Sequence, residues 1–128
     1  MNINAVTVFC GSKPGNDLAY VTAAENLGTM LAQNGITLVY GGGNKGIMGA
    51  LANSCLIAGG KVTGIIPKLL LEWEAQHEGL TELIVTESMH ARKLLLYEKC
   101  DVAVILPGGM GTLDELFEML TWNNLKIH

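Results

Sequence analysis

Residues 106–115, LPGGMGTLDE, combine a glycine-rich turn with a nearby carboxylate. Three glycines follow the proline of this segment: Gly108, Gly109 and Gly111. Without Cβ atoms, their backbone N–H groups can come within bonding distance of an oxyanion. Thr112 is predicted to begin a helix, and the positive end of a helix favours an anion such as phosphate. The segment therefore predicts a phosphate-binding turn.

Glu115 has two possible roles beside this turn. It can close a capping box with Thr112, because the spacing matches the S/T-x-x-E pattern in which the carboxylate returns to the first N–H of the helix. It can also serve as a catalytic carboxylate at the mouth of the anion site. The local pattern leaves both roles open.

A second group of chemically capable residues lies in ESMHARK, where His90, Arg92 and Lys93 stand early in a predicted helix. Cations are mildly unfavourable at a helix start unless an anion meets them. The alternative is a solvated helical face, and His90 can equally be a partly buried residue without a chemical role. Arg92 differs in kind, because its planar guanidinium can bind a phosphate or carboxylate through two parallel bonds.

Another glycine-rich turn, GGGNKG, follows the second predicted strand and matches G-x-G-x-x-G at residues 41–46. That pattern alone is a weak sign of dinucleotide binding. The fingerprint belongs after the first strand, and the acidic residue expected about 20 positions later is absent, because residues 63–69 read TGIIPKL. The turn is interpreted either as close packing alone or as packing that also presents amides, including that of Gly43, to a ligand.

These segments require a scaffold, and the chain reads as alternating strands and helices. Strands are expected at 5–10, 36–40, 61–66 and 101–106, with a short extra strand over 82–86, and helices at 16–33, about 46–58, 88–99 and 113–125. Near-continuous apolar strands separated by helices predict an α/β fold, a doubly wound, Rossmann-like parallel sheet with helices on both faces. If the first strand lies between the second and the strand over 101–106, the turns at 10–15, 41–46 and 107–111 converge on one crevice.

Composition limits the class of protein. The chain has 128 residues, of which 49% are hydrophobic and 16% are charged, as expected for one globular domain over residues 1–128. The net charge of −4 argues against non-specific binding of nucleic acid, and no apolar run is long enough to span a membrane. Cys10, Cys55 and Cys100 are predicted to be reduced thiols of a cytoplasmic protein, and no signal peptide is visible at the start of the sequence.

The combination of PGGMGTLDE with SMHARK upstream resembles the LOG (LONELY GUY) family. These are cytokinin-activating nucleoside 5′-monophosphate phosphoribohydrolases, often labelled lysine decarboxylases. The motif P-G-G-x-G-T-x-x-E is matched from Pro107 to Glu115, and M-H-x-R-K from Met89 to Lys93. The early C-G-S turn and the GGG-x-x-G-x-M-G turn fit as well, so the resemblance runs from Val6 to His128.

The resemblance implies hydrolysis of an N-glycosidic bond, of AMP or a cytokinin riboside 5′-monophosphate, without a cofactor or metal. It makes Arg92 and Glu115 the catalytic pair. The residues implied to bind substrate are Gly11, Ser12, Gly43, Glu74, Arg92, Lys93, Gly108, Gly109, Met110, Gly111, Thr112, Leu113, Asp114, Glu115 and Thr121. Tryptophan at position 73 stands where the family often has arginine, which loosens the alignment around Glu74.

Two alternatives to the hydrolase stay open. One is a non-catalytic nucleotide or molybdenum-cofactor carrier of the same fold, although a carrier has no need for the Glu115 carboxylate. The other is a dinucleotide-dependent oxidoreductase, which the missing ribose-binding acid disfavours.

The resemblance also implies a homodimer, and an excess of apolar residues at 94–97 and 113–122 predicts uncovered patches for a partner copy. Family members continue beyond WNNLKIH, so a C-terminally short domain without the last strand and helix is expected.

Overall fold

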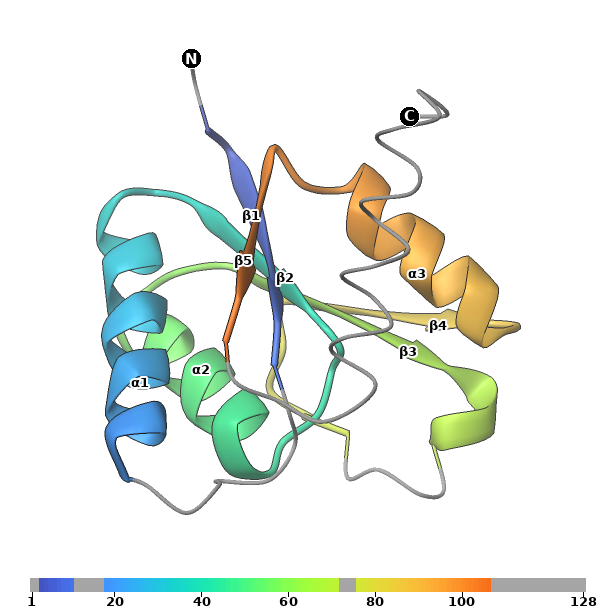
Figure 1. Cartoon of the computed structure of the whole chain (residues 1–128), viewed down its shortest axis with the longest axis horizontal. Coiled ribbons are helices and arrows are strands. Elements are labelled where there is room, and N and C mark those ends of the chain that lie inside the picture. The colour runs from blue at the N-terminus through green and yellow to red at the C-terminus, as the bar shows by residue number, and fades with distance from the viewer. Residues whose placement is uncertain (1–2, 11–17, 72–75, 107–128) are drawn as a thin grey trace.

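The protein forms a five-stranded parallel sheet with helices on both faces, as seen in a computed structural model that describes residues 3–10, 18–71 and 76–106 (Figure 1). The elements in chain order are β1 (Ala5–Phe9), α1 (Leu18–Gln33), β2 (Thr37–Tyr40), α2 (Gly46–Ile57), β3 (Val62–Pro67), the short 3-10 helix η1 (Lys68–Leu70), β4 (Glu82–Thr86), α3 (Met89–Glu98) and β5 (Val102–Ile105). The predicted α/β class is confirmed, and the uncertain strand over 82–86 is present as β4.

The order of the strands across the sheet is β4-β3-β2-β1-β5, and all neighbouring pairs are parallel. The chain adds strands outward from β1 to β4 and then returns to the other side of β1. The condition set by the sequence is therefore met, because β1 lies between β2 and β5. The direction of winding reverses between β1 and β5, where ligands bind in open α/β sheets.

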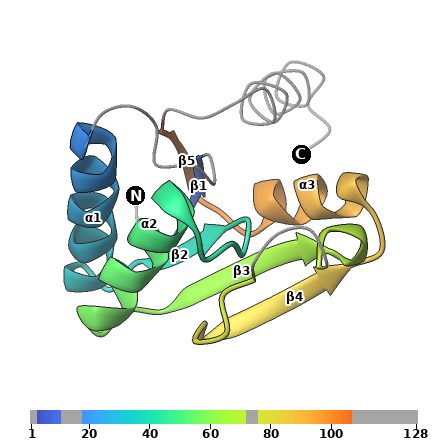
Figure 2. The ribbon, with the colours of Figure 1, turned by 90° about the horizontal axis from the view of Figure 1, so that it is seen from below.

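The two faces of the sheet have separate apolar cores. On one face, α1 and α2 lie side by side and cover residues such as Val8, Leu38 and Tyr40. On the other face, α3 packs over a smaller core of Phe9, Val39, Ile65 and Leu96. Figure 2 shows α1 and α2 together at one side and α3 above β3 and β4. This two-sided cover explains why the inner strands are mostly apolar and almost entirely buried.

Hydrogen bonds from side chains fix β1 against its neighbours. The buried Thr7 hydroxyl donates to the Leu96 carbonyl of α3 at 2.6 Å. At the start of the strand, Asp101 accepts the Asn4 and Ala5 N–H groups at 2.8 Å and 3.1 Å. These two backbone bonds hold the pKa of the Asp101 carboxyl below its usual value.

The apolar run at 94–97 is better covered than the sequence suggested. Leu96 and Tyr97 are buried, and Leu94 and Leu95 are half-buried. Position 95 packs against the core beneath α3 rather than facing outward. The other run, at 113–122, lies outside the described residues, as does the predicted helix at 113–125.

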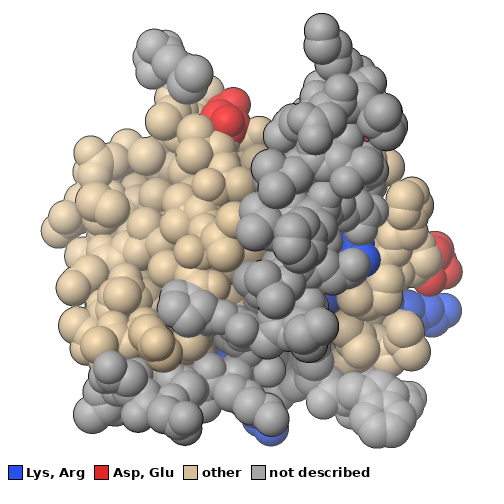
Figure 3. Space-filling model, in the orientation of Figure 1, with Lys and Arg blue, Asp and Glu red and all other residues tan. Residues whose placement is uncertain are grey.

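On the face in view, Figure 3 shows a broad area over α1 without Lys, Arg, Asp or Glu. No disulfide joins Cys10, Cys55 and Cys100, of which the first two are buried and the third is half-buried. Among the described helices, none is both long and apolar enough to cross a membrane.

Candidate active site

Arg92 is a buried cation held by the ends of two strands. Its side chain is 5% exposed. The guanidinium donates from Nε to the Ile65 carbonyl at 2.9 Å and from Nη2 to the Gly41 carbonyl at 2.8 Å. Both acceptors are neutral backbone groups near the carboxyl ends of β3 and β2. The site therefore lies at the carboxyl ends of the strands, at β2 and β3, beside the point between β1 and β5 where the winding reverses.

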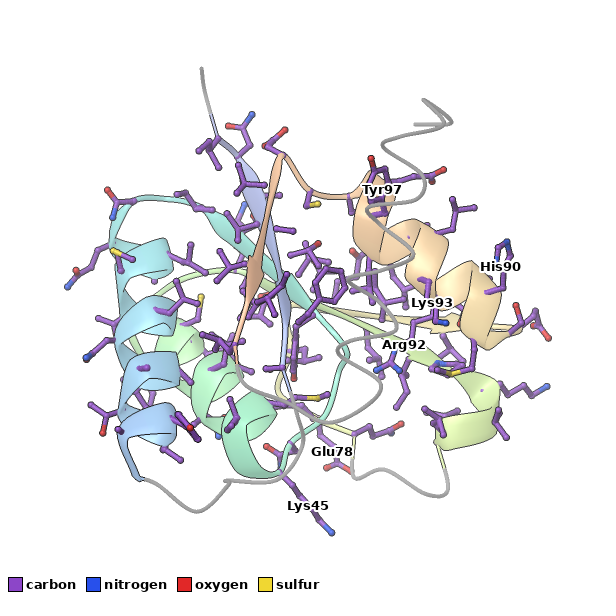
Figure 4. The ribbon with its side chains drawn as sticks, viewed as in Figure 1. Lys45, Glu78, His90, Arg92, Lys93 and Tyr97 are labelled. Carbon is purple, nitrogen blue, oxygen red and sulfur yellow. The ribbon has the colours of Figure 1, made fainter. Side chains whose placement is uncertain are left out.

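The start of α3 aims Arg92 at this edge. Ser88 caps the helix by accepting the Ala91 N–H at 3.1 Å, and its own carbonyl accepts the Thr86 hydroxyl at 2.9 Å. A serine at this position satisfies an N–H that would otherwise lack a partner in the first turn. The cap fixes where the helix begins, so Arg92 faces the sheet while His90, two residues earlier, points away from it (Figure 4).

The guanidinium of Arg92 occupies the space that a side chain at position 41 would fill. A Cβ atom built at Gly41 would lie 2.3 Å from Arg92 Nη2, well inside contact distance. Arg92 is also the only arginine in the sequence. The sequence predicts close packing of the following helix at this turn, whereas the group that approaches Gly41 is the guanidinium of Arg92, 51 residues away in the chain.

The charge on Arg92 has no carboxylate partner among the described residues. Two of the five N–H donors of a guanidinium are used by the two carbonyls. A buried cation that meets only neutral dipoles is costly, by several kcal/mol as an order of magnitude. An anion brought to the remaining donors, either a carboxylate or a ligand phosphate, would offset that cost.

The glycine turn itself is held by two other elements. The Tyr40 hydroxyl donates to the Gly43 carbonyl at 2.7 Å, and the His77 N–H donates to the Gly42 carbonyl at 2.9 Å. Gly43 also pairs with Gln76 in an antiparallel bridge. Gly42 has a φ of +84°, a conformation that favours glycine. Packing accounts for the glycines of this turn, and a ligand contact at Gly43 stays a prediction.

His77 connects the segment after η1 to α2. Its Nδ1 accepts the Gly79 N–H at 2.9 Å, so the proton of the neutral ring is on Nε2, which donates to Asn53 Oδ1 at 2.6 Å. The side chain is 8% exposed. Burial lowers the pKa of the His77 imidazole below its ordinary value of 6.5.

The structure separates the three basic residues of ESMHARK. Arg92 is buried, Lys93 is half-buried and His90 is exposed. The alternative of a solvated helical face therefore holds for His90 but not for Arg92. The other predicted site residues lie outside the described residues: Gly11, Ser12, Glu74, Gly108, Gly109, Met110, Gly111, Thr112, Leu113, Asp114, Glu115 and Thr121.

Sequence reasoning missed Tyr40, Asn53 and His77. Tyr40 reads as one more apolar residue at the end of β2. His77 lies between residues 67 and 80, where no periodicity predicts an element, and its partners are distant in the chain. The described residues contain no group of three or more His, Cys, Asp or Glu side chains placed to hold a metal ion.

The chain is similar to a family of hydrolases in sequence and to carrier proteins in fold. Residues 48–128 match a family model described as possible lysine decarboxylase. Over 97% of its length the chain is 49% identical to a cytokinin riboside 5′-monophosphate phosphoribohydrolase of Rhodococcoides fascians, and over 96% it is 44% identical to the enzyme of that name from Arabidopsis thaliana, LOG1. It spans 63% and 58% of those two relatives.

Among solved structures, the chain superimposes on the molybdenum cofactor carrier protein of Chlamydomonas reinhardtii with a TM-score of 0.81 at 24% identity, covering 95% of this chain and 73% of that one. The molybdenum cofactor binding protein of Rippkaea orientalis superimposes with a TM-score of 0.78 at 26% identity. The match covers 94% of this chain and 72% of that protein. The first likeness shows the fold, which agrees with the sheet described above.

The low pKa of His77 predicts a pH dependence of stability. The unfolded chain binds this proton near pH 6.5 and the folded protein only at lower pH, so the free energy of unfolding should fall as the pH drops below about 6.5. One such group changes it by at most about 1.4 kcal/mol per pH unit. Urea unfolding of the parent protein and His77→Gln between pH 7.5 and 5.5 measures this, with His90→Gln as the control. Equal pH slopes for the parent and His77→Gln would contradict the assignment.

Proposed function

The chain belongs to the LOG family, matched by the model described as possible lysine decarboxylase, and from this membership we propose that it is a nucleoside 5′-monophosphate phosphoribohydrolase. The reaction is hydrolysis of the N-glycosidic bond of AMP or a cytokinin riboside 5′-monophosphate to the free base and ribose 5-phosphate. The relatives at 40–49% identity bear names for this activity, some of them as probable enzymes.

The observation that supports this proposal most is the buried charge of Arg92. Its described partners are two neutral carbonyls, so the site has positive charge to offer an anionic group. The substrates and products of the proposed reaction bear a phosphate and several sugar oxygens, which a guanidinium binds well. Arg92 lies near the carboxyl edge of the sheet, where phosphate-binding turns of this fold class lie.

The chemistry requires a carboxylate near the sugar. Cleaving a base from ribose passes through an oxocarbenium-like state with positive charge on the sugar ring. In the proposed mechanism Glu115 stabilises that charge and activates the attacking water. Arg92 binds substrate oxygens and keeps Glu115 ionised. The turn at 108–112 holds the phosphate, which positions the bond to be broken.

A second candidate is a carrier that binds a nucleotide or the molybdenum cofactor without turnover. The solved structures of carrier and binding proteins favour it, since their folds are close to this one at 24–26% identity. The higher identity to named hydrolases favours the enzyme, as does the presence of both Arg92 and Glu115. Release of free base from a bound nucleotide would distinguish the two functions.

The form of the substrate gives the first test of the proposed function. If a phosphate anchors the substrate, nucleoside 5′-monophosphates should be cleaved and the corresponding nucleosides should not. Chromatography of a panel with AMP, an N6-prenylated AMP and their nucleosides would detect the free base. Equal rates on AMP and adenosine would refute the phosphate anchor, and binding without release of base would favour the carrier.

Glu115→Gln separates the capping role from the catalytic role. Glutamine can still serve a capping box, but it has no charge to stabilise the sugar cation. We expect a folded protein whose turnover of AMP is lowered by about 100-fold or more, the scale of one lost electrostatic or acid–base contribution. Thermal unfolding of both proteins controls for stability. Near-normal turnover would assign Glu115 to the cap.

We also propose a homodimer with Arg92 and Glu115 near the shared surface. The family resemblance supports it, whereas the cover found over residues 94–97 means that α3 offers less apolar surface than its sequence suggested. Light scattering at micromolar concentration should give the mass of two chains. A stable monomer that hydrolyses AMP would contradict both the dimer and a site shared between copies.

A further inference from the structure

The three successive carbonyls of the glycine turn each accept a hydrogen bond from a different part of the fold. Gly41 accepts from Arg92 of α3, Gly42 from the backbone of His77, and Gly43 from the Tyr40 hydroxyl of β2. All three glycines are buried. The position of the Arg92 guanidinium therefore depends on the conformation of a turn that two other residues restrain.

We propose that Tyr40 and His77 are positioning residues, which hold the glycine turn so that the Gly41 carbonyl fixes the Arg92 guanidinium at the substrate. This inference rests on the proposed function insofar as Arg92 contacts substrate. It assigns no chemistry to Tyr40 or His77 themselves.

The turn needs such restraint because of its composition. Three consecutive glycines have the greatest backbone freedom of any tripeptide, and Gly42 lies at a φ of +84°. A small rotation of the turn would redirect the Gly41 carbonyl and with it the Nη2 group of Arg92. A displacement of about 1 Å in a catalytic group can lower a rate by about 100-fold.

Tyr40 is suited to hold the turn. Its side chain is 0% exposed, and its hydroxyl reaches the Gly43 carbonyl three residues later at 2.7 Å. Burial, with a smaller contribution from Cys10, raises the pKa of the Tyr40 hydroxyl, so the group stays protonated and keeps donating. The ring is fixed in the core with Leu38 and Ile47. The hydroxyl thus ties the flexible turn to a rigid part of β2.

His77 holds the turn through its backbone. The N–H that donates to Gly42 belongs to a segment fixed by the His77 ring, which bonds to Gly79 at one nitrogen and to Asn53 of α2 at the other. The neighbouring Gln76 pairs with Gly43. Loss of the ring would release this segment, and with it the donor to Gly42.

Arg92 supplies a direct signal for the test, because it is the only arginine in the sequence. Its Nε–H, which donates to Ile65, gives a single side-chain resonance in a ¹⁵N-edited NMR spectrum, assigned by its loss in Arg92→Lys. Tyr40→Phe removes one hydroxyl and little volume. Tyr20→Phe is the matched control, because Tyr20 lies on α1 and is 41% exposed.

We expect Tyr40→Phe to shift the Arg92 Nε–H resonance and to speed the exchange of this proton with solvent. We also expect kcat/KM for AMP to fall by about tenfold, which is less than the loss for a catalytic group displaced by a full ångström. Tyr20→Phe should change neither. An unchanged Arg92 resonance in Tyr40→Phe, or the same change in Tyr20→Phe, would overturn the proposal. The NMR measurement needs no substrate, so a protein that cleaves no nucleotide would refute the proposed function and leave this test intact.

The two ring nitrogens of His77 can be tested separately. These variants also test the proposal if Tyr40→Phe does not fold. Asparagine retains an acceptor near the Nδ1 position for the Gly79 N–H, glutamine retains a donor near the Nε2 position for Asn53, and alanine retains neither. The proposal expects His77→Ala to displace the Arg92 resonance more than either conservative variant. An Arg92 resonance unchanged in His77→Ala would overturn the role of this residue.

Discussion

The buried guanidinium of Arg92 is the constraint from which the arrangement of this edge of the sheet follows. A positive charge with 5% exposure requires acceptors that come close from inside the protein. The carbonyls of Gly41 and Ile65 provide them only because β2 and β3 end side by side in parallel register. A side chain at position 41 would have to displace the guanidinium from this place. The arginine therefore favours glycine there, independently of any ligand.

The position of α3 follows from two attachments on different strands. Arg92, near its start, bonds to the ends of β2 and β3, and the Leu96 carbonyl, one turn later, accepts the Thr7 hydroxyl of β1. Both attachments are buried and cross from one layer of the fold to another. Together they fix the height and rotation of the helix over the sheet, which apolar packing of Leu96 alone would leave less specific. The geometry of the site therefore depends on how α3 packs across the whole face of the sheet that it covers.

The sequence predicts the scaffold well because strand and helix signals are local. Apolar strands and glycine stops placed the described strands and α-helices within about two residues, and the position of β1 between β2 and β5 agrees with the expected crevice. The site was harder to predict. The turn at 41–46 is predicted to allow close packing of the following helix, but the partner of Gly41 is Arg92, 51 residues away in the chain. The bonds of His77 to Asn53 and Gly42 depend on folded geometry that no spacing rule encodes.

A buried arginine of this kind is poorly explained by stability alone. Among the described residues, two neutral carbonyls satisfy two of its donors without neutralising the charge, and an apolar side chain of similar volume would avoid that cost. Natural proteins keep such locally unfavourable choices mainly where function requires them. The surrounding features fit this view, since the glycine turn, the helix cap and the His77 segment restrict the guanidinium instead of neutralising it. A cation that the described residues hold in place without neutralising it is suited to bind an anion, and a bound anion would then stabilise the fold that prepared its site.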